Sequence, residues 1–216
     1  MKTNKIVLLL LLAVSTFSSF AQKKVDFGVQ AGYSYAMPKV KSSQLDGNLN
    51  GIHFGPTLKY NINEKVGIQT GLLYNYNNTI ISKITVGDSK TWQQTRILGH
   101  SLDVPLRAIY SISLADDFYI LLGAGPNFNY ALSKYNQKEN YVNGKIVDDL
   151  TLHNTNIYAS PSDFNPFDVQ MSASVGIQYM KISLQASYAW GIMDRDKTVN
   201  GTNRENNIKV SLGYSF

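Results

Sequence analysis

The sequence contains no cysteine among its 216 residues. This absence excludes disulfide bonds, a lipid anchor on a cysteine and metal sites built from thiolates. Long apolar runs are also missing after the first 21 residues, where no stretch reaches the roughly 18 residues expected of a transmembrane helix. An exported chain of this kind either stays in solution or crosses a membrane as a closed β-barrel, because only helices and closed barrels satisfy the backbone in lipid.

Sequence motifs of catalytic and metal sites are absent as well. The chain has no HExxH, no GxSxG and no ligand pair at a fixed spacing. We therefore interpret His53, His100 and His153 as solvated or lumen-lining side chains and predict no catalytic residue, no metal and no cofactor. One alternative stays open, an enzyme that acts on outer-leaflet lipid with Ser101 beside His100, although adjacent residues in a strand point to opposite faces.

Basic residues outnumber acidic ones by 20 to 15, which gives a formal charge of +5. No basic run is interleaved with aromatic residues, as a nucleic-acid surface would require. The charge is therefore interpreted as a solvated surface, and no nucleic-acid partner is predicted.

The first residues have the pattern of a secretory signal peptide. A short basic segment, residues 1–5, precedes an apolar stretch from Ile6 to Val14, and Ser19-Phe20-Ala21 supplies the small residues that a signal peptidase accepts. We expect residues 1–21 to be removed and residues 22–216 to form a single domain.

Eight segments with alternating apolar and polar residues occupy that domain. The clearest is the last, where Ile208, Val210, Leu212, Tyr214 and Phe216 share one face of a strand. The expected strands are residues 25–36, 51–61, 66–77, 101–113, 118–130, 167–179, 181–190 and 206–216. Short turns at residues 62–65, 114–117 and 180 alternate with long connections, as in barrels with short periplasmic turns and long extracellular loops.

The volume of the side chains indicates which face meets lipid. One face carries large aromatic and aliphatic residues, which the narrow interior of about eight strands cannot hold. The other face is small and polar, so it fits inside. The aromatic residues also gather at both ends of the strands, which is typical of the two girdles of a membrane barrel. We therefore predict an all-β, eight-stranded antiparallel up-and-down barrel in the bacterial outer membrane, surrounded by outer-membrane lipid and monomeric.

Three segments resemble a known family. Ser101-Leu102-Asp103-Val104-Pro105-Leu106-Arg107-Ala108-Ile109-Tyr110, Leu122-Gly123-Ala124-Gly125-Pro126 and Ser174-Val175-Gly176-Ile177-Gln178-Tyr179 resemble strands of the PorT-like outer-membrane β-barrel family of Bacteroidetes. The founding member of that family is implicated in protein secretion, and most members have no assigned activity. Tyr214 and Phe216 resemble the C-terminal signal read by the barrel assembly machinery, which implies that this machinery is a partner.

Charged residues on the lumen face form a candidate ion network. The predicted members are Asp26, Lys59, Asp103, Arg107, Asp168 and Lys209. An ionised group in a narrow lumen needs an opposite charge or a hydrogen-bond donor, so an interior network is expected. Strand direction predicts that Asp26, Lys59 and Arg107 lie near the periplasmic end. A narrow passive pore is the alternative interpretation.

The long loops are the stronger functional candidates, because rigid scaffolds commonly present function on loops. Residues 80–97 are predicted to form a hairpin above the membrane, and residues 131–166 a long loop rich in tyrosine and asparagine. The candidate contact residues are Trp92, Tyr135, Tyr141 and Tyr158. We expect a non-enzymatic protein that engages a protein or an envelope glycan through these loops or through its periplasmic rim.

Overall fold

The computed structural model describes residues 24–40, 48–85, 90–147, 156–159, 162, 164–197 and 202–216. The predicted signal peptide, residues 1–21, lies outside the described residues and stays a prediction. The same holds for the interpretation of His153 as a solvated or lumen-lining side chain. Within the described part of the chain, no helix is both long enough and apolar enough to cross a bilayer.

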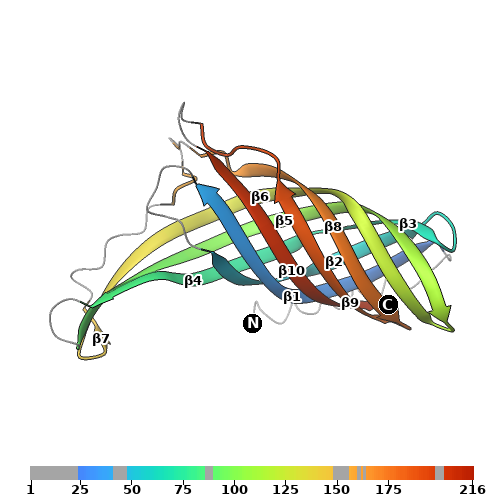
Figure 1. The fold of residues 1–216 in the computed structure, drawn as a ribbon, viewed down its shortest axis with the longest axis horizontal. Coiled ribbons are helices and arrows are strands. Elements are labelled where there is room, and N and C mark those ends of the chain that lie inside the picture. The colour runs from blue at the N-terminus through green and yellow to red at the C-terminus, as the bar shows by residue number, and fades with distance from the viewer. Residues whose placement is uncertain are drawn as a thin grey trace, which may run out of the picture.

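The described residues form one antiparallel sheet that closes on itself (Figure 1). Its strands are β1 (Val25–Val40), β2 (Leu49–Asn61), β3 (Val66–Gly71), β4 (Leu73–Thr85), β5 (Thr91–Ala115), β6 (Phe118–Val142), β7 (Lys145–Ile146), β8 (Phe167–Tyr179), β9 (Ile182–Gly191) and β10 (Asn203–Ser215). Closure comes from β1, which pairs with β2 on one side and with β10 on the other. Because β3 and β4 are two parts of one spanning strand, eight strands surround the lumen, and the predicted barrel is confirmed.

The break between β3 and β4 lies at Leu72, opposite Pro56 of β2. The Leu72 N–H donates to the Pro56 carbonyl at 3.1 Å. Proline has no N–H to return the bond, so the ladder is interrupted at this position. The predicted strand of residues 66–77 is therefore correct in extent but not continuous.

The two faces of the sheet agree with the prediction. Exposed aromatic and aliphatic side chains, among them Phe54, Leu122, Val175 and Leu212, cover the outside. Small and polar residues point inward and are buried. The apolar face is therefore the outer one, as the side-chain volumes predict.

The lumen is less polar than predicted. Leu73, Ile109 and Leu121 point into it and are buried. Space for Ile109 comes from the neighbouring strand, where a Cβ atom on Gly123 would lie 2.7 Å from the Ile109 Cδ1 atom. Apolar side chains are therefore interspersed with polar ones in the interior, since Leu73 is opposite Asp103 whereas Ile109 is opposite Gly67.

The largest departure from the prediction is the length of β6. The sequence predicts a loop for residues 131–142, but these residues continue β6 and pair with β5 as far as Thr91 and Val142. The predicted hairpin is confirmed from Ile80, opposite Arg96, to Thr85, opposite Trp92, with a bulge between Ile80 and Ser82. These polar residues form a strand because their backbone groups pair with those of β5. The alternation of apolar and polar residues within the segment does not indicate this pairing.

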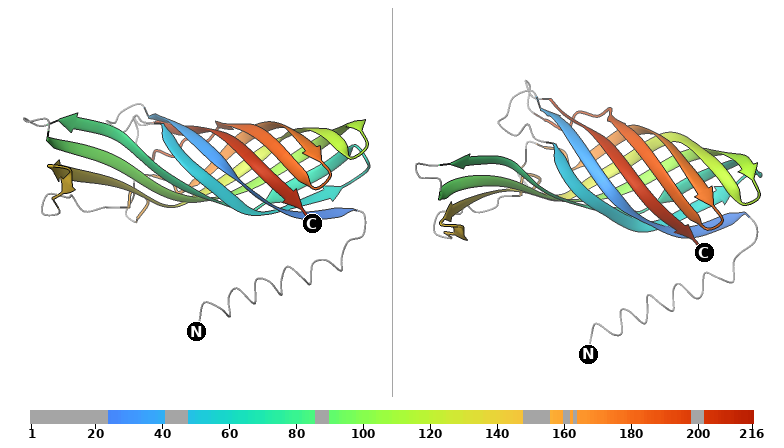
Figure 2. Two further views of the ribbon diagram at one scale, coloured as in Figure 1. Left: turned by 90° about the horizontal axis from the view of Figure 1, so that it is seen from below. Right: turned by 60° about the horizontal axis from the view of Figure 1, so that its bottom comes forward.

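Strands β4, β5 and β6 extend well past the other strands, on the side of the barrel that has the long connections (Figures 1 and 2). We call this part, residues 79–85, 90–98 and 132–147, the extracellular arm, because the sequence predicts that the long connections face the outside of the cell. The two-residue strand β7 folds back on its tip, where Tyr141 is opposite Ile146 and Val142 is opposite Lys145.

Candidate functional site

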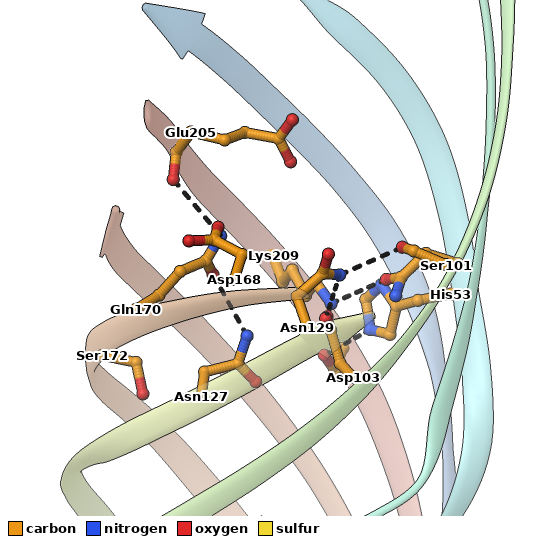
Figure 3. A network of polar contacts seen from close by, with 12 residues as sticks. His53, Ser101, Asp103, Asn127, Asn129, Asp168, Gln170, Ser172, Glu205 and Lys209 are labelled. Atoms are coloured by element: carbon orange, nitrogen blue, oxygen red, sulfur yellow. Dashed lines mark hydrogen bonds and ion pairs between the residues drawn. The ribbon is translucent and has the colours of Figure 1, made fainter. Parts of the chain in front are cut away.

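An ion pair between β5 and β10 lies at the centre of the lumen (Figure 3). The Lys209 ammonium contacts the Asp103 carboxylate and donates to the Asn75 Oδ1 atom at 2.7 Å. The other Asp103 oxygen accepts a hydrogen bond from the Asn129 amide at 2.6 Å, and the same amide donates to the Ser101 hydroxyl at 3.1 Å. Both charged groups are buried and have several partners, so this cluster holds two distant strands together across the lumen.

Arg107 lies deeper in the barrel than predicted. Its guanidinium donates to the Ser172 hydroxyl at 3.2 Å and to Gln185 at 3.5 Å. It lines the same small cavity as Lys209, whereas Lys59 lines a different one. The prediction that Arg107 belongs to the periplasmic end is therefore wrong, because the tilt of the strands shifts residues of different strands in depth.

Asp168 is placed near the outer mouth, at the second residue of β8. It is fully buried and accepts a hydrogen bond from the Gln170 amide at 2.9 Å, while its Oδ1 atom has no partner among the described residues. The Gln170 side chain also bonds to Asn127 at 3.1 Å and to the Glu205 carbonyl at 3.2 Å (Figure 3). These amides tie β6, β8 and β10 together.

Arg195, which the sequence did not single out, closes the mouth above Asp168. Its guanidinium donates to the carbonyl oxygens of Asn165 and Pro166, each at 3.1 Å, and lies 4.9 Å from the centre of the Tyr158 ring. Arginine in a loop gives no local signal for such a role. Tyr158, a predicted loop contact, is thus engaged at the mouth of the barrel.

Asp194, directly before Arg195, holds the connection between β9 and β10 in place. Its Oδ1 atom accepts hydrogen bonds from the backbone N–H groups of Asn203 at 2.8 Å and Asp196 at 3.0 Å. These bonds favour the ionised form, and the one from Asn203 contributes most to holding the pKa of Asp194 below its ordinary value of 3.8.

Asp26 and Lys59 lie at the periplasmic mouth, away from the central pair. Asp26 accepts from the Asn61 amide at 2.7 Å, and the Lys59 ammonium reaches the Ser111 hydroxyl at 3.5 Å. Of the six predicted network residues, the structure joins only Asp103 and Lys209 in an ion pair. Of the other four, Asp26 and Lys59 are neighbours at the periplasmic mouth, Arg107 lines the cavity beside Lys209, and Asp168 lies near the outer mouth.

Small cavities lie along the lumen, inside a wider one at the periplasmic mouth. Three polar ones have volumes of about 40, 10 and 30 Å³, from the periplasmic side to the outer mouth. Each has room for at most a few water molecules. Side chains therefore fill the interior between them.

The two described histidines, His53 and His100, lie on opposite faces of the sheet. The His100 Nδ1 atom is 2.5 Å from the Tyr74 hydroxyl on the outer face, while Ser101 points inward to Asn129. His53 is buried in the lumen, with its Nε2 atom 2.8 Å from the Ser211 hydroxyl. Across the described ranges, no three side chains of His, Cys, Asp or Glu come together as a metal site would need.

The extracellular arm brings two predicted contact residues together. Trp92 and Tyr141 are opposite each other on β5 and β6, with the Lys83 ammonium 4.5 Å from the centre of the Trp92 ring. Beside them, Glu139 accepts hydrogen bonds from Gln94 and Tyr141, each at 3.0 Å. The fourth predicted contact, Tyr135, lies at the base of the arm opposite Asn156.

Among the described residues of the arm six side chains are basic and one is acidic. The basic ones are Lys83, Lys90, Arg96, Lys134, Lys138 and Lys145. Glu139 is the acidic one and pairs with Arg96 at 3.6 Å. The adjoining sequence adds Asp88, Asp148 and Asp149, so basic residues exceed acidic ones by two over residues 79–98 and 132–149. This excess was not visible from the sequence, because the segments that share it are brought together only when β6 extends along β5.

The sequence over residues 20–197 matches the model of the family described as "Outer membrane protein beta-barrel domain". The chain belongs to this family. It is accordingly a small β-barrel protein of the bacterial outer membrane, as its closed sheet and apolar outer band also indicate. No curated protein sequence matches the chain significantly.

Several solved outer-membrane barrels have a similar fold. Ail, the attachment invasion locus protein of Yersinia pestis, is 11% identical, with a TM-score of 0.41, and the match covers 89% of this chain and 99% of that one. Neisserial surface protein A is 15% identical, with a TM-score of 0.40 and coverage of 88% and 97%. The N-terminal barrel domain of Pseudomonas aeruginosa OprF is 12% identical, with a TM-score of 0.35 and coverage of 88% and 97%.

Proposed function

We propose that this protein is a non-enzymatic surface-binding barrel whose extracellular arm engages a partner outside the cell. The observation that carries the proposal is the length of the arm strands. A membrane-spanning strand needs about 9 to 11 residues, whereas β5 and β6 each have 25. The additional residues contribute nothing to crossing the bilayer, and they build a defined sheet instead of a loose loop.

The charge of the arm supports a negatively charged partner. Lys83 and Arg96 lie on the outward face beside the Trp92 and Tyr141 rings, and Glu139 between them is buried. Cations at the edge of an interface increase the rate of association with an anionic partner, and salt weakens this effect. Aromatic rings and arginine are the side chains that most often anchor such contacts.

The two alternative functions have less support. A passive pore would need a continuous wide path, but side chains fill the middle of the lumen and leave a cavity of only about 10 Å³ beside Arg107 and Lys209. A lipid-modifying enzyme built on Ser101 and His100 would need their side chains to meet, and they point to opposite faces of β5. The narrower resemblance to the PorT-like group stays a prediction and carries no part of this proposal.

Photo-crosslinking in whole cells tests the proposal. A photoreactive residue at Ile84 of the arm is compared with one at Ile62 of a periplasmic turn, since both isoleucines are about half exposed, at 58% and 52%. We expect an adduct from Ile84 that protease added to intact cells removes, and no such adduct from Ile62.

The charge argument predicts a second result in the same assay. Replacing Lys83 and Lys90 with glutamine should lower the yield of the Ile84 adduct, and raised salt should lower the wild-type yield in parallel. Absence of any surface adduct from Ile84, with the protein present at normal levels, would rule out the arm as the binding surface.

A further inference from the structure

A second candidate site lies at the opposite end of the barrel, at the periplasmic mouth. The cavity there has a volume of about 500 Å³. This is within the range of small-molecule pockets, about 300 to 1,000 Å³. Its lining includes four charged residues, Lys24, Asp26, Lys59 and Glu64, and the polar residues Asn61, Asn63, Ser111, Tyr119 and Gln178. Lys24 and Glu64 lie at its exposed rim, whereas Asp26 and Lys59 also line the smaller cavity further in.

The cavity has a closed inner end. It continues into the smaller cavity of about 40 Å³, which shares Asp26, Lys59 and Gln178 with it. Ile109 and Leu121 line that smaller cavity and are almost fully buried, at 2% and 7% exposure. The next cavity along the lumen, which shares Gln30 and Ser211 with this one, has a volume of only about 10 Å³. A solute that enters from the periplasm therefore meets a lumen filled by side chains, and the mouth is a pocket and not the entrance of a channel.

Two opposite charges lie side by side in this pocket without forming an ion pair. Asp26 of β1 is directly opposite Lys59 of β2, a position where side chains of neighbouring strands normally interact. The Asp26 carboxylate instead accepts from Asn61, and the Lys59 ammonium extends to Ser111 on β5 at a long 3.5 Å. The two charged groups are thus drawn apart, with polar space between them.

The wall that carries these groups is rigid. The Asn61 N–H donates to the Lys24 carbonyl at 2.6 Å, and the Asn63 side chain accepts from the N–H groups of Lys65 at 2.9 Å and Val66 at 2.8 Å. The Lys65 carbonyl in turn accepts from the Ser111 N–H at 2.7 Å. Such a fixed turn lowers the entropy cost of ordering the pocket around a ligand.

We infer that the periplasmic mouth binds a small zwitterion, such as an amino acid or a short peptide. The carboxylate of the ligand contacts the Lys59 ammonium, and its ammonium contacts the Asp26 carboxylate. Tyr119 and Gln178, on the opposite wall, supply hydrogen bonds to the rest of the ligand. Opposite charges held apart on a rigid wall complement a ligand that carries both signs, and a ligand with one charge would satisfy only one of them.

The test is a binding titration of the full barrel in lipid nanodiscs, followed by NMR. Three probes separate the charges: dialanine carries both, N-acetylalanine carries only the carboxylate and alaninamide carries only the ammonium. We expect saturable binding of dialanine, with affinities about tenfold lower for each singly charged probe. Shifts are expected at the amides of Tyr119 and Gln178.

Two variants assign the charges. Lys59→Gln should lower dialanine affinity about tenfold and leave alaninamide binding unchanged, and Asp26→Asn should weaken alaninamide but not N-acetylalanine. Lys145→Gln, on the exposed β7, is the matched control and should change nothing. Heat-modifiable gel mobility checks that each variant is folded. The proposal is overturned if dialanine does not bind saturably, if it binds no better than N-acetylalanine, or if Lys59→Gln leaves its affinity unchanged.

Discussion

Trp92 of β5 and Tyr141 of β6 stack face to face, with ring centroids 4.9 Å apart and ring planes 8° apart. This contact lies near the far end of the extracellular arm, beyond the membrane-spanning part of both strands. Cross-strand aromatic pairs add about 0.5 to 1.5 kcal/mol beyond the area they bury. The stack therefore helps polar strands to stay paired where neither lipid nor a closed barrel supports them.

Replacing Trp92 with alanine should loosen the tip of the arm and leave the barrel intact. The substitution removes the stack and the Lys83 contact, and we expect faster amide hydrogen exchange at residues 91–95 and 138–142. Trp92→Phe, which keeps an aromatic ring, should recover most of the protection. Exchange rates at the tip that match the wild type in Trp92→Ala would show that the ring pair does not stabilise the arm.

The ion pair in the lumen should be far more sensitive to loss of one partner than of both. Lys209→Met leaves the buried Asp103 carboxylate without its counter-ion, which costs about 3 to 5 kcal/mol in such pairs. Combining Lys209→Met with Asp103→Asn should restore a large part of that loss. Urea unfolding in lipid vesicles measures both, with Lys145→Met as the exposed control. Equal stability of the single and double variants would contradict this role of the pair.

The assignment of the lipid-facing side gives a depth-dependent prediction. Leu122 lies outward in the middle of β6, so Leu122→Arg should cost about 2 to 4 kcal/mol of folding free energy in a bilayer. Leu114, also outward but at a periplasmic turn, should tolerate arginine at a cost of about 0 to 1 kcal/mol. Folding titrations in vesicles compare the two. Similar costs at both positions would mean that β6 does not cross the bilayer at this depth.

The loop after β9 should depend on pH through Asp194. Its pKa is lowered in the folded protein, so its contribution is present above the ordinary value of 3.8 and is lost as pH falls through the lower folded value. We expect protection factors at the amides of Asp196 and Asn203 to fall in that acidic range. Asp194→Asn should show reduced protection already at neutral pH and little further change on acidification. An acid response that persists in Asp194→Asn would assign it to another group.

The sequence predicts the barrel well because alternation, side-chain volume and connection length are local signals. All eight spanning strands, the two faces and the hairpin at residues 80–85 and 91–97 follow from them. The continuation of β6 does not, because residues 132–142 lack clear alternation and become a strand only by pairing with β5. The break at Leu72 depends on a proline in a different strand, which pattern reading within one segment does not consider.

The candidate site shows the same division. The two-residue period of a strand predicts that Asp103 and Lys209 face the lumen. Predicting that they pair across the barrel would require knowledge of the tilt and register of β5 and β10, which are far apart in the sequence. The mouth contacts of Arg195 are with backbone carbonyls, for which the sequence carries no signal. The separation of Asp26 from Lys59 likewise follows from the competing partners Asn61 and Ser111.

The central claim is that the extracellular arm stands on the cell surface while the short turns face the periplasm. Cysteines introduced singly at Gly144, beside β7 on the arm, and at Asn63, in the β2–β3 turn, test it in a chain that has no other cysteine. On intact cells, an impermeant maleimide should label Gly144→Cys and leave Asn63→Cys unlabelled until the outer membrane is opened. Labelling of Asn63→Cys on intact cells, with Gly144→Cys protected, would invert the topology and contradict the account.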